Sequence, residues 1–277
     1  MVSPAFLSQA SAIVGDRFTK RDVASLDAYG TDAVNRTHRP DLVLLPGSRD
    51  EVSDLTRLCH HHKVPLVVRG GGTGYSGGAV PIRGGLVVSL ERLNQILEID
   101  ETNLLARVQP SVITADLHAA AERVGLLFPP DPASLQRSTI GGNIAECAGG
   151  PRAFKYGTTK RYVLGLEVVL PTGEVIHTGS KAVKNVVGYD LTQLLVGSEG
   201  TLGIITEATV RLVPQPPARA TLRATFGTIE SAAGAVTALI RARVVPAAIE
   251  LIDADCLDAV GTYVGVPLAP AGTGALL

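Results

Sequence analysis

The clearest helical signal in the chain lies in its first quarter. Apolar residues recur at helical spacing at positions 52, 55, 58 and 59. Just before them, Ser48 is followed three residues later by Glu51, which is the arrangement of a capping box. A helix is therefore predicted from Ser48 to the cations at 60–63, because positive charge suits a helix C-terminus.

Short apolar runs bounded by Gly, Pro and polar residues predict strands. They are expected at 65–68, 86–89, 104–108, 162–170, 175–178, 204–213 and 220–226. The runs at 162–170 and 175–178 flank Pro171-Thr172-Gly173-Glu174 and predict a β-hairpin. Further helices are predicted at 114–125, with Thr114 as N-cap, at 191–195 and at 229–243. This mixture indicates an α+β protein.

The run Pro214-Gln215-Pro216-Pro217 is typical of a linker and predicts a domain boundary near residue 214. Between 128 and 157, Gly and Pro are frequent and no regular pattern continues. Loops of that length in a compact chain are usually functional. The chain ends on the apolar run GALL with no stop signal, so we expect it to end within a strand.

Composition narrows the function classes. The 277 residues are 45% hydrophobic and 18% charged, with a formal net charge of -1. These values fit a globular protein without a field that attracts nucleic acid or anionic membranes. No apolar run approaches the roughly 20 residues of a spanning helix, and no signal-peptide pattern opens the chain. Three widely spaced cysteines argue against a disulfide framework and a cysteine-based metal site, and favour the cytoplasm.

The strongest candidate for binding chemistry is the glycine loop, which we define as residues 70–78, directly after the predicted strand at 65–68. Between Val67 and Gly78, six of twelve residues are glycine. Glycines let a ligand approach the main chain, and consecutive N–H groups in such a turn bind anions. The loop matches neither the dinucleotide fingerprint nor a Walker loop. We therefore expect it to hold a phosphate, most simply the diphosphate of a nucleotide cofactor.

Six motifs in order carry a family resemblance: RGGGTGYSGG, PPDPAS, STIGGNIAECAGGP, KYGTTKRYVLGLEVVLPTGEV, VKNVVGYDLTQLLVGSEGTLGIITEATVRL and AAIELIDADCLDAV. The chain resembles the flavin-binding domain of the vanillyl-alcohol oxidase superfamily. Within it, the likeness is to the FAD-linked D-2-hydroxy-acid dehydrogenase and glycolate oxidase D-subunit family. The resemblance runs from about Arg39 to Pro214 and continues more weakly to Val260.

The resemblance implies a fold and domain order. It implies a PCMH-type FAD-binding domain over residues 1–214, with subdomains of about 1–100 and 101–214. Residues 215–277 would be the start of an α+β cap domain.

It also implies the cofactor-binding residues. The loop residues Arg69, Gly70, Gly71, Gly72, Thr73, Gly74 and Ser76 would surround the FAD diphosphate. Pro130, Asp131, Ser134, Thr139, Gly142, Asn143 and Ala145 would line the isoalloxazine and ribityl chain, and Gly200, Gly203 and Ile205 would approach through main-chain atoms. Some members of the superfamily tether flavin through a His in the first loop, where this chain has Thr73, so non-covalent FAD is expected.

The implied activity is oxidation of a small 2-hydroxy acid, glycolate or D-lactate, by hydride transfer to flavin N5 while a base takes the hydroxyl proton. The family's His-x-Gly-Asp-Gly motif and paired His of the cap are absent from this sequence. No catalytic or metal-binding residue is therefore assigned, and an inactive fragment is expected. An FAD-binding module in a complex with partner subunits, or another oxidoreductase of the superfamily, stays open.

Two other candidates have simpler interpretations. The run His60-His61-His62 is expected to be a solvated helix end, because adjacent residues do not share a helix face. Cys147 stands where the family often has Asn and is expected to be a packed neutral thiol, with a redox role beside flavin as the alternative.

Overall fold

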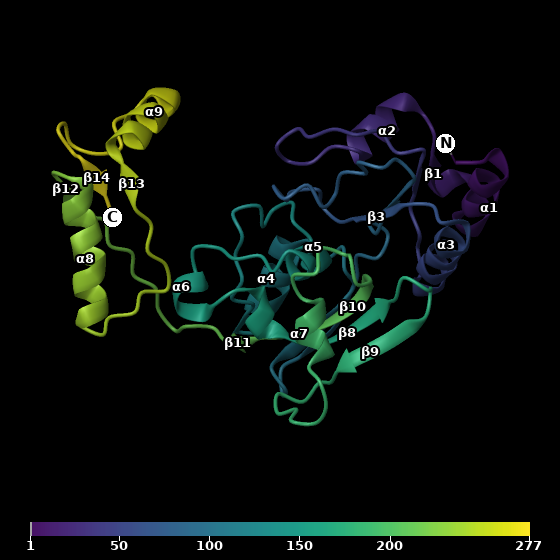
Figure 1. The fold of residues 1–277 in the computed structure, drawn as a ribbon. Helices are drawn as coiled ribbons and strands as arrows, with labels where there is room; N and C mark the ends of the chain where they lie inside the picture. The colour runs from purple at the N-terminus through teal and green to yellow at the C-terminus, as the bar shows by residue number, and fades with distance from the viewer. Residues whose placement is uncertain (1) are drawn as a thin grey trace. The chain divides into compact units, whose positions relative to one another are not determined.

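The computed structural model describes residues 2–277, which divide into two compact units. Unit 1 comprises residues 2–128, 132–148 and 158–215; unit 2 comprises 129–131, 149–157 and 216–277. Figure 1 labels many of the elements of the two units. No helix among the described residues combines the length and apolar character needed to cross a bilayer.

Unit 1 contains two larger sheets. Its helices are α1 (Pro4–Val14), α2 (Val23–Tyr29), α3 (Arg49–His62), α4 (Thr114–Glu122), α5 (Ile140–Ala145) and α7 (Leu191–Leu195), with 3-10 turns η1 (Asp16–Phe18) and η2 (Thr159–Tyr162). Its strands are β1 (Thr19–Lys20), β2 (Leu42–Leu44), β3 (Leu66–Arg69), β4 (Leu86–Ser89), β5 (Ile96–Asp100), β6 (Leu105–Val108), β7 (Leu126–Leu127), β8 (Val163–Val169), β9 (Val175–Gly179), β10 (Ile204–Arg211) and β11 (Val213–Pro214).

The first sheet has the order β1-β2-β4-β3, and its last three strands run parallel. Both of its faces are buried. Leu42 and Leu44 pack into the larger core with residues of α1 and α3, whereas Val43 and Val87 pack with Leu26 of α2. A parallel sheet covered on both faces has continuous apolar strands, which is why LVL and LVVS show no polar alternation. Figure 1 shows α1 and α3 side by side.

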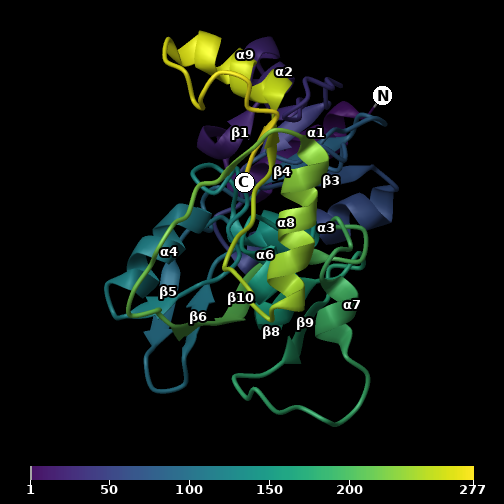
Figure 2. The same cartoon turned by 90° about the vertical axis from the view of Figure 1, so that its left-hand side faces the viewer.

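The second sheet is antiparallel, with the order β5-β6-β10-β8-β9, as Figure 2 shows. The predicted hairpin is confirmed, because β8 and β9 pair antiparallel from Val169–Val175 to Gly165–Gly179. The strand predicted at 204–213 is divided into β10 and β11. The short β11 leaves the sheet and pairs with β7.

The helix predicted from Ser48 is also confirmed as α3. The Ser48 hydroxyl accepts the Glu51 N–H at 3.1 Å, while the Glu51 carboxylate accepts the Gly47 N–H at 2.7 Å. The first interaction satisfies an N–H group of the first helical turn, which has no helical partner, and the second fixes the residue before the cap. The helix ends at His62, and Lys63 follows with a left-handed φ of 57°.

The prediction that Thr114 caps its helix is wrong. The N-cap of α4 is Ile113, and no side chain caps this helix. The Thr114 hydroxyl is buried and is used in tertiary contacts instead, lying 2.9 Å from the Ser138 hydroxyl and accepting the Asn143 amide at 2.7 Å. A buried hydroxyl is stabilised by such partners more than by solvated capping.

Unit 2 contains α6 (Ala153–Tyr156), α8 (Ile229–Arg241) and α9 (Ala254–Val264), with β12 (Thr225–Phe226), β13 (Ile252–Asp253) and β14 (Ala275–Leu276) in the order β12-β14-β13. The strand predicted at 220–226 is reduced to β12, because 220–224 are exposed and have no regular structure. The strand expected at the end of the chain is present as β14. The long irregular stretch predicted at 128–157 contains α5 and α6.

Candidate functional site: a glycine-lined loop

The glycine loop begins where β3 ends and packs against the segment that precedes α5. A Cβ on Gly70 would lie 2.5 Å from Thr139 Oγ1, and one on Gly71 would overlap the carbonyl oxygen of Arg137. Gly72 has a φ of +64°, which L side chains rarely adopt. Glycine is therefore favoured at three successive positions, because Gly70 and Gly71 lie directly on Thr139 and Arg137 and the backbone of Gly72 is left-handed.

Four successive N–H groups of this loop are available to a ligand. Within residues 2–277, no acceptor of the protein receives a hydrogen bond from the main-chain N–H of Gly71, Gly72, Thr73 or Gly74. All four residues are half-buried. A diphosphate would satisfy their N–H groups, and its negative charge suits a concave row of N–H groups. The residues present therefore fit the diphosphate of FAD.

A second glycine turn, at 197–203, approaches the same region of unit 1. The Gly197 N–H donates to Ile144 at 3.0 Å, and the Glu199 N–H donates to Ala145 at 2.9 Å, which ties the turn to the end of α5. Gly200 has a φ of +74°, and a Cβ there would lie 2.7 Å from Val68 Cγ1 in β3. The turn, α5 and the strand that leads into the glycine loop are therefore neighbours.

The predicted residues of α5 and its cap are held by internal contacts. Thr139 Oγ1 accepts the Gly142 N–H at 3.3 Å, and the Asn143 amide donates to Thr114 at 2.7 Å while being almost fully buried. Ala145 accepts from Glu199 through its carbonyl oxygen. These residues lie beside the glycine loop, and their side chains chiefly hold α5 in position.

Three other predicted residues of unit 1 have different surroundings. Ser134 is half-buried, and its carbonyl oxygen accepts the N–H groups of Arg137 and Ser138, each at 2.8 Å. Gly203 and Ile205 lie at the start of β10, both buried, and a Cβ on Gly203 would lie 2.5 Å from Val168 Cγ1. Gly203 therefore lies against the main chain and side chains of β8.

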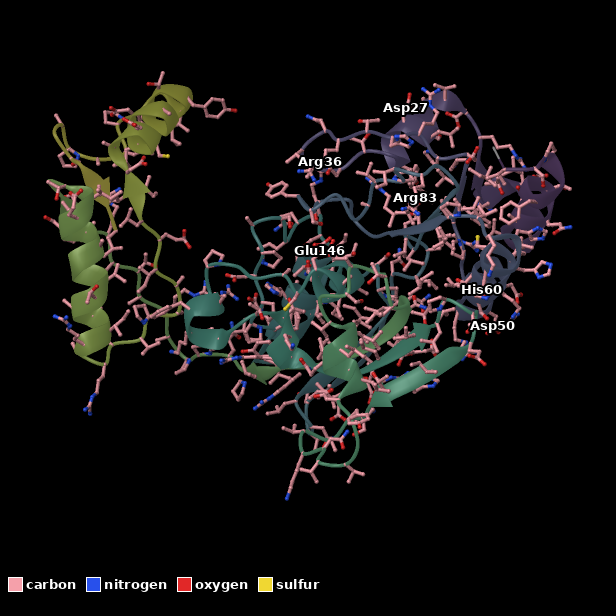
Figure 3. The ribbon with its side chains drawn as sticks, in the orientation of Figure 1. Asp27, Arg36, Asp50, His60, Arg83 and Glu146 are labelled. Carbon is pink, nitrogen blue, oxygen red and sulfur yellow. The ribbon has the colours of Figure 1, made fainter. Side chains whose placement is uncertain are left out.

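Ser76 does not have a free hydroxyl. Its Oγ lies 3.0 and 3.1 Å from the two carboxylate oxygens of Glu146 and donates to them. Glu146, labelled in Figure 3, was not among the residues found from the sequence, and no spacing pattern marks it. The contact fixes the far end of the glycine loop to the residue that follows α5.

Pro130 and Asp131 belong to unit 2. The Asp131 carboxylate accepts the Arg152 N–H at 3.0 Å and forms an ion pair with the Arg152 guanidinium at 3.1 Å. Gly150 packs closely on Asp131, since a Cβ there would overlap the Asp131 carbonyl oxygen. These contacts stabilise the connection between 129–131 and 149–157.

A cavity of about 370 Å³ in unit 1 lies away from the predicted residues. It is lined by the ends of β8 and β9 and by the segment that leads into α7, including His177, Asn185, Tyr189 and Asp190. Asp190 caps α7 by accepting the Gln193 N–H at 2.9 Å, and His177 lies 3.0 Å from the Glu167 carboxylate. These polar groups have structural partners within the described chain.

Fold and loop together define the class as a flavin-binding domain. Residues 40–179 match the model of the FAD binding domain family, and residues 215–277 match the C-terminal domain of FAD linked oxidases. The chain belongs to this family of FAD-linked oxidases, and its cofactor is FAD. The α+β fold agrees with this assignment.

Comparison with individual proteins shows which members of the family this chain is similar to. The chain is 51% identical to glycolate oxidase subunit GlcD of Bacillus subtilis over 86% of this chain and 51% of that protein. It is 36% identical to D-lactate dehydrogenase of Anaerostipes hadrus over 97% and 57%. A solved structure of alkyldihydroxyacetonephosphate synthase superposes with a TM-score of 0.84, at 25% identity, over 100% of this chain and 58% of that one. The chain spans about half the length of the curated relatives it matches.

Cys147, at the end of α5, has a backbone conformation that suits Asn better. Its φ is +50°, and its Sγ lies 3.4 Å from the Thr158 hydroxyl. The left-handed region costs most side chains about 1 kcal/mol, and Asn occupies it more readily than Cys. We expect Cys147→Asn to raise the free energy of unfolding by about 0.5–1 kcal/mol, measured by urea denaturation.

The matched control for this variant is Cys256→Asn. Cys256 lies in the first turn of α9 and is exposed, and it is not among the positive-φ residues. No gain in stability is expected there. An unchanged or lower free energy of unfolding for Cys147→Asn would show that its backbone is not strained.

Proposed function

We propose that this chain provides the FAD site of an oxidoreductase acting on a small 2-hydroxy acid, with glycolate and D-lactate as the first candidates. The observation that carries the proposal is the row of four N–H groups at residues 71–74 that have no acceptor within residues 2–277. The row follows Gly70 and Gly71, which pack too closely on Thr139 and Arg137 to carry a side chain. The likeness to a glycolate oxidase subunit and a D-lactate dehydrogenase supports the substrate class.

In this proposal, residues 1–214 form the FAD-binding domain and 215–277 begin the cap domain. The division of the chain into units near residue 215 supports that boundary. FAD is held without a covalent bond, because Thr73 stands in the loop where a His would be needed for a tether. Partner subunits of a glycolate-oxidase-like complex and a cytoplasmic location complete the proposal.

The chain's own residues bind and orient the cofactor. The loop N–H groups of Gly71, Gly72, Thr73 and Gly74 would donate hydrogen bonds to the diphosphate and offset part of its charge, with Gly70 and Ser76 completing the loop. Within unit 1, the lining contributed by 134–145 and by Gly200, Gly203 and Ile205 would orient the isoalloxazine and ribityl parts. Bound FAD supplies the electron acceptor for oxidation of the carbon that bears the hydroxyl. No residue of this chain is assigned as the base that removes the hydroxyl proton.

The test separates cofactor binding from turnover. The purified chain should show flavin absorbance near about 450 nm, a property of the cofactor. Anaerobic addition of glycolate or D-lactate should leave that absorbance unchanged. A chimera that continues this chain with the unmatched C-terminal half of the Bacillus subtilis relative should be bleached by one of these acids.

The outcomes distinguish the alternatives. Flavin in both proteins without bleaching of the chimera by either acid would overturn the substrate proposal and favour a binding module without catalysis. That module is the second candidate function. Bleaching of the unmodified chain would show that catalysis needs no further residues.

A further inference from the structure

The back of the glycine loop is held by a segment from earlier in the chain, residues 29–37, which we call the clasp segment. Two arginines connect them reciprocally. Arg69, at the end of β3, donates through Nη1 to the Thr31 carbonyl oxygen at 2.8 Å. Arg36 of the clasp segment, labelled in Figure 3, donates through Nη1 to the Tyr75 carbonyl oxygen at 3.1 Å.

Arg69 also lies directly behind the loop main chain. A Cβ on Gly72 would overlap the Arg69 guanidinium, so the planar group fills the space next to that residue. One side chain therefore contacts both the clasp segment and the middle of the row of open N–H groups. Its hydrogen bond to Thr31 fixes where that planar surface lies.

Nearby groups offset part of the cost of keeping the Arg69 charge partly out of water. Burial lowers the pKa of Arg69, while Tyr29, Asp32 and Glu91 lie close enough to raise it. The Tyr29 ring centre is 6.0 Å from the guanidinium carbon, and its hydroxyl donates to Glu91 at 2.8 Å. Burial, followed by the contact with Glu91, raises the pKa of Tyr29 to about 12, so the hydroxyl stays protonated as a donor.

Asp32 shapes the clasp segment. Its Oδ1 accepts the N–H groups of Val34 at 3.0 Å and Arg36 at 2.8 Å, which turns the chain so that Arg36 can reach Tyr75. Asp32 is 5% exposed, and its Oδ2 has no hydrogen-bond partner within residues 2–277. The positive charge of the Arg69 guanidinium stabilises this buried carboxylate. The attraction between the two charges is a second interaction that holds the clasp segment against Arg69.

We propose that Arg69 is a positioning residue for the cofactor: held by the clasp segment, its guanidinium fixes the main chain of Gly71–Gly74 so that their N–H groups face the diphosphate. This inference rests on the proposed FAD site. It differs from the direct phosphate contact expected from the sequence, because Arg69 acts through Gly72 and Thr31. Lysine cannot replace Arg69 in this role, because a single ammonium group lacks the planar guanidinium that contacts both Gly72 and Thr31.

The decisive comparison is Arg69→Lys against Arg83→Lys, which changes an exposed arginine between β3 and β4. Arg69→Lys should weaken the binding of FAD and of ADP by about tenfold or more, the scale of a lost charged hydrogen bond. Binding of riboflavin, which lacks the diphosphate, should be unchanged, as should all binding by Arg83→Lys. Equal FAD binding by Arg69→Lys and the unaltered chain, or a matching loss for riboflavin, would overturn the inference.

A second measurement tests the clasp without cofactor. The N–H groups of His38 and Asp32 donate within the clasp region to Gly30 and Arg36, at 3.0 and 3.1 Å. In the FAD-free chain, amide hydrogen exchange of the 30–38 peptide should be about tenfold faster in Arg69→Lys than in Arg83→Lys. Equal exchange in the two variants would overturn the inference that Arg69 holds the clasp segment. If the unaltered chain bound no FAD, the proposed function would fail. The exchange measurement would still show whether Arg69 holds the clasp segment.

Discussion

Gly71→Ala is expected to weaken FAD binding about 100-fold, the cost of misplacing a binding group by about 1 Å. The added methyl group would overlap the Arg137 carbonyl oxygen and lie 3.4 Å from Ser138 Cα. That main chain cannot move away cheaply, because the N–H groups of Arg137 and Ser138 each donate to Ser134 at 2.8 Å. The loop must move instead, and its N–H groups move with it.

The control for this variant is Gly234→Ala. Gly234 lies within α8, and nothing is within 4 Å of the position its Cβ would take. Alanine is a better helix former than glycine, so stability should be unchanged or higher. Titration of flavin fluorescence would measure both dissociation constants. If Gly71→Ala bound FAD as tightly as Gly234→Ala, the loop would not be the diphosphate site.

Phe128→Ala is expected to lower the free energy of unfolding of unit 1 by about 3–5 kcal/mol. The Phe128 ring is fully buried, and it makes edge contacts with His118 at 5.9 Å and Tyr162 at 6.2 Å between ring centres. Truncation removes the apolar burial and leaves a cavity between these rings. Urea denaturation of the purified chain would measure the loss.

Phe154→Ala is the matched control for the ring. Phe154 lies in α6 and is 47% exposed, so its removal should change the free energy of unfolding by less than about 1 kcal/mol. If Phe128→Ala lowered the free energy of unfolding by a similarly small amount, the Phe128 ring would not be packed in the core of unit 1.

Elements built from local patterns could be predicted from the sequence. The cap and period of α3, the strand β4 and the β8–β9 hairpin all depend on residues a few positions apart. The helix α7 was also predicted from its apolar residues. In each case, local propensity and burial favour the same structure, so tertiary contacts did not have to override it.

Elements that depend on contacts between distant residues could not be predicted from the sequence. The sequence IGGNIA has two glycines and poor helix propensity, yet it forms α5, because Gly141 packs against Pro110 and Asn143 bonds to Thr114. The same hydroxyl of Thr114 was expected to cap α4 and is used here instead. Nothing local distinguishes these two uses.

In the candidate site, too, the local feature could be predicted from the sequence and the distant contacts could not. Glycine density marked the loop, because only glycine fits where main chains touch. The contacts that hold it, Arg69 to Thr31 and Ser76 to Glu146, join residues 38 and 70 positions apart. No spacing rule reveals such pairs, so Thr31, Arg36 and Glu146 emerge only from the folded structure.

The central claim is that the glycine loop holds the diphosphate of FAD, and a paired titration tests it most directly. The purified chain, stripped of flavin, would be titrated with FAD and with riboflavin under the same conditions. The account predicts that FAD binds and that riboflavin binds at least about 100-fold more weakly, because it offers no charge to the N–H groups of Gly71–Gly74. Equal binding of the two flavins, or no binding of FAD, would contradict it.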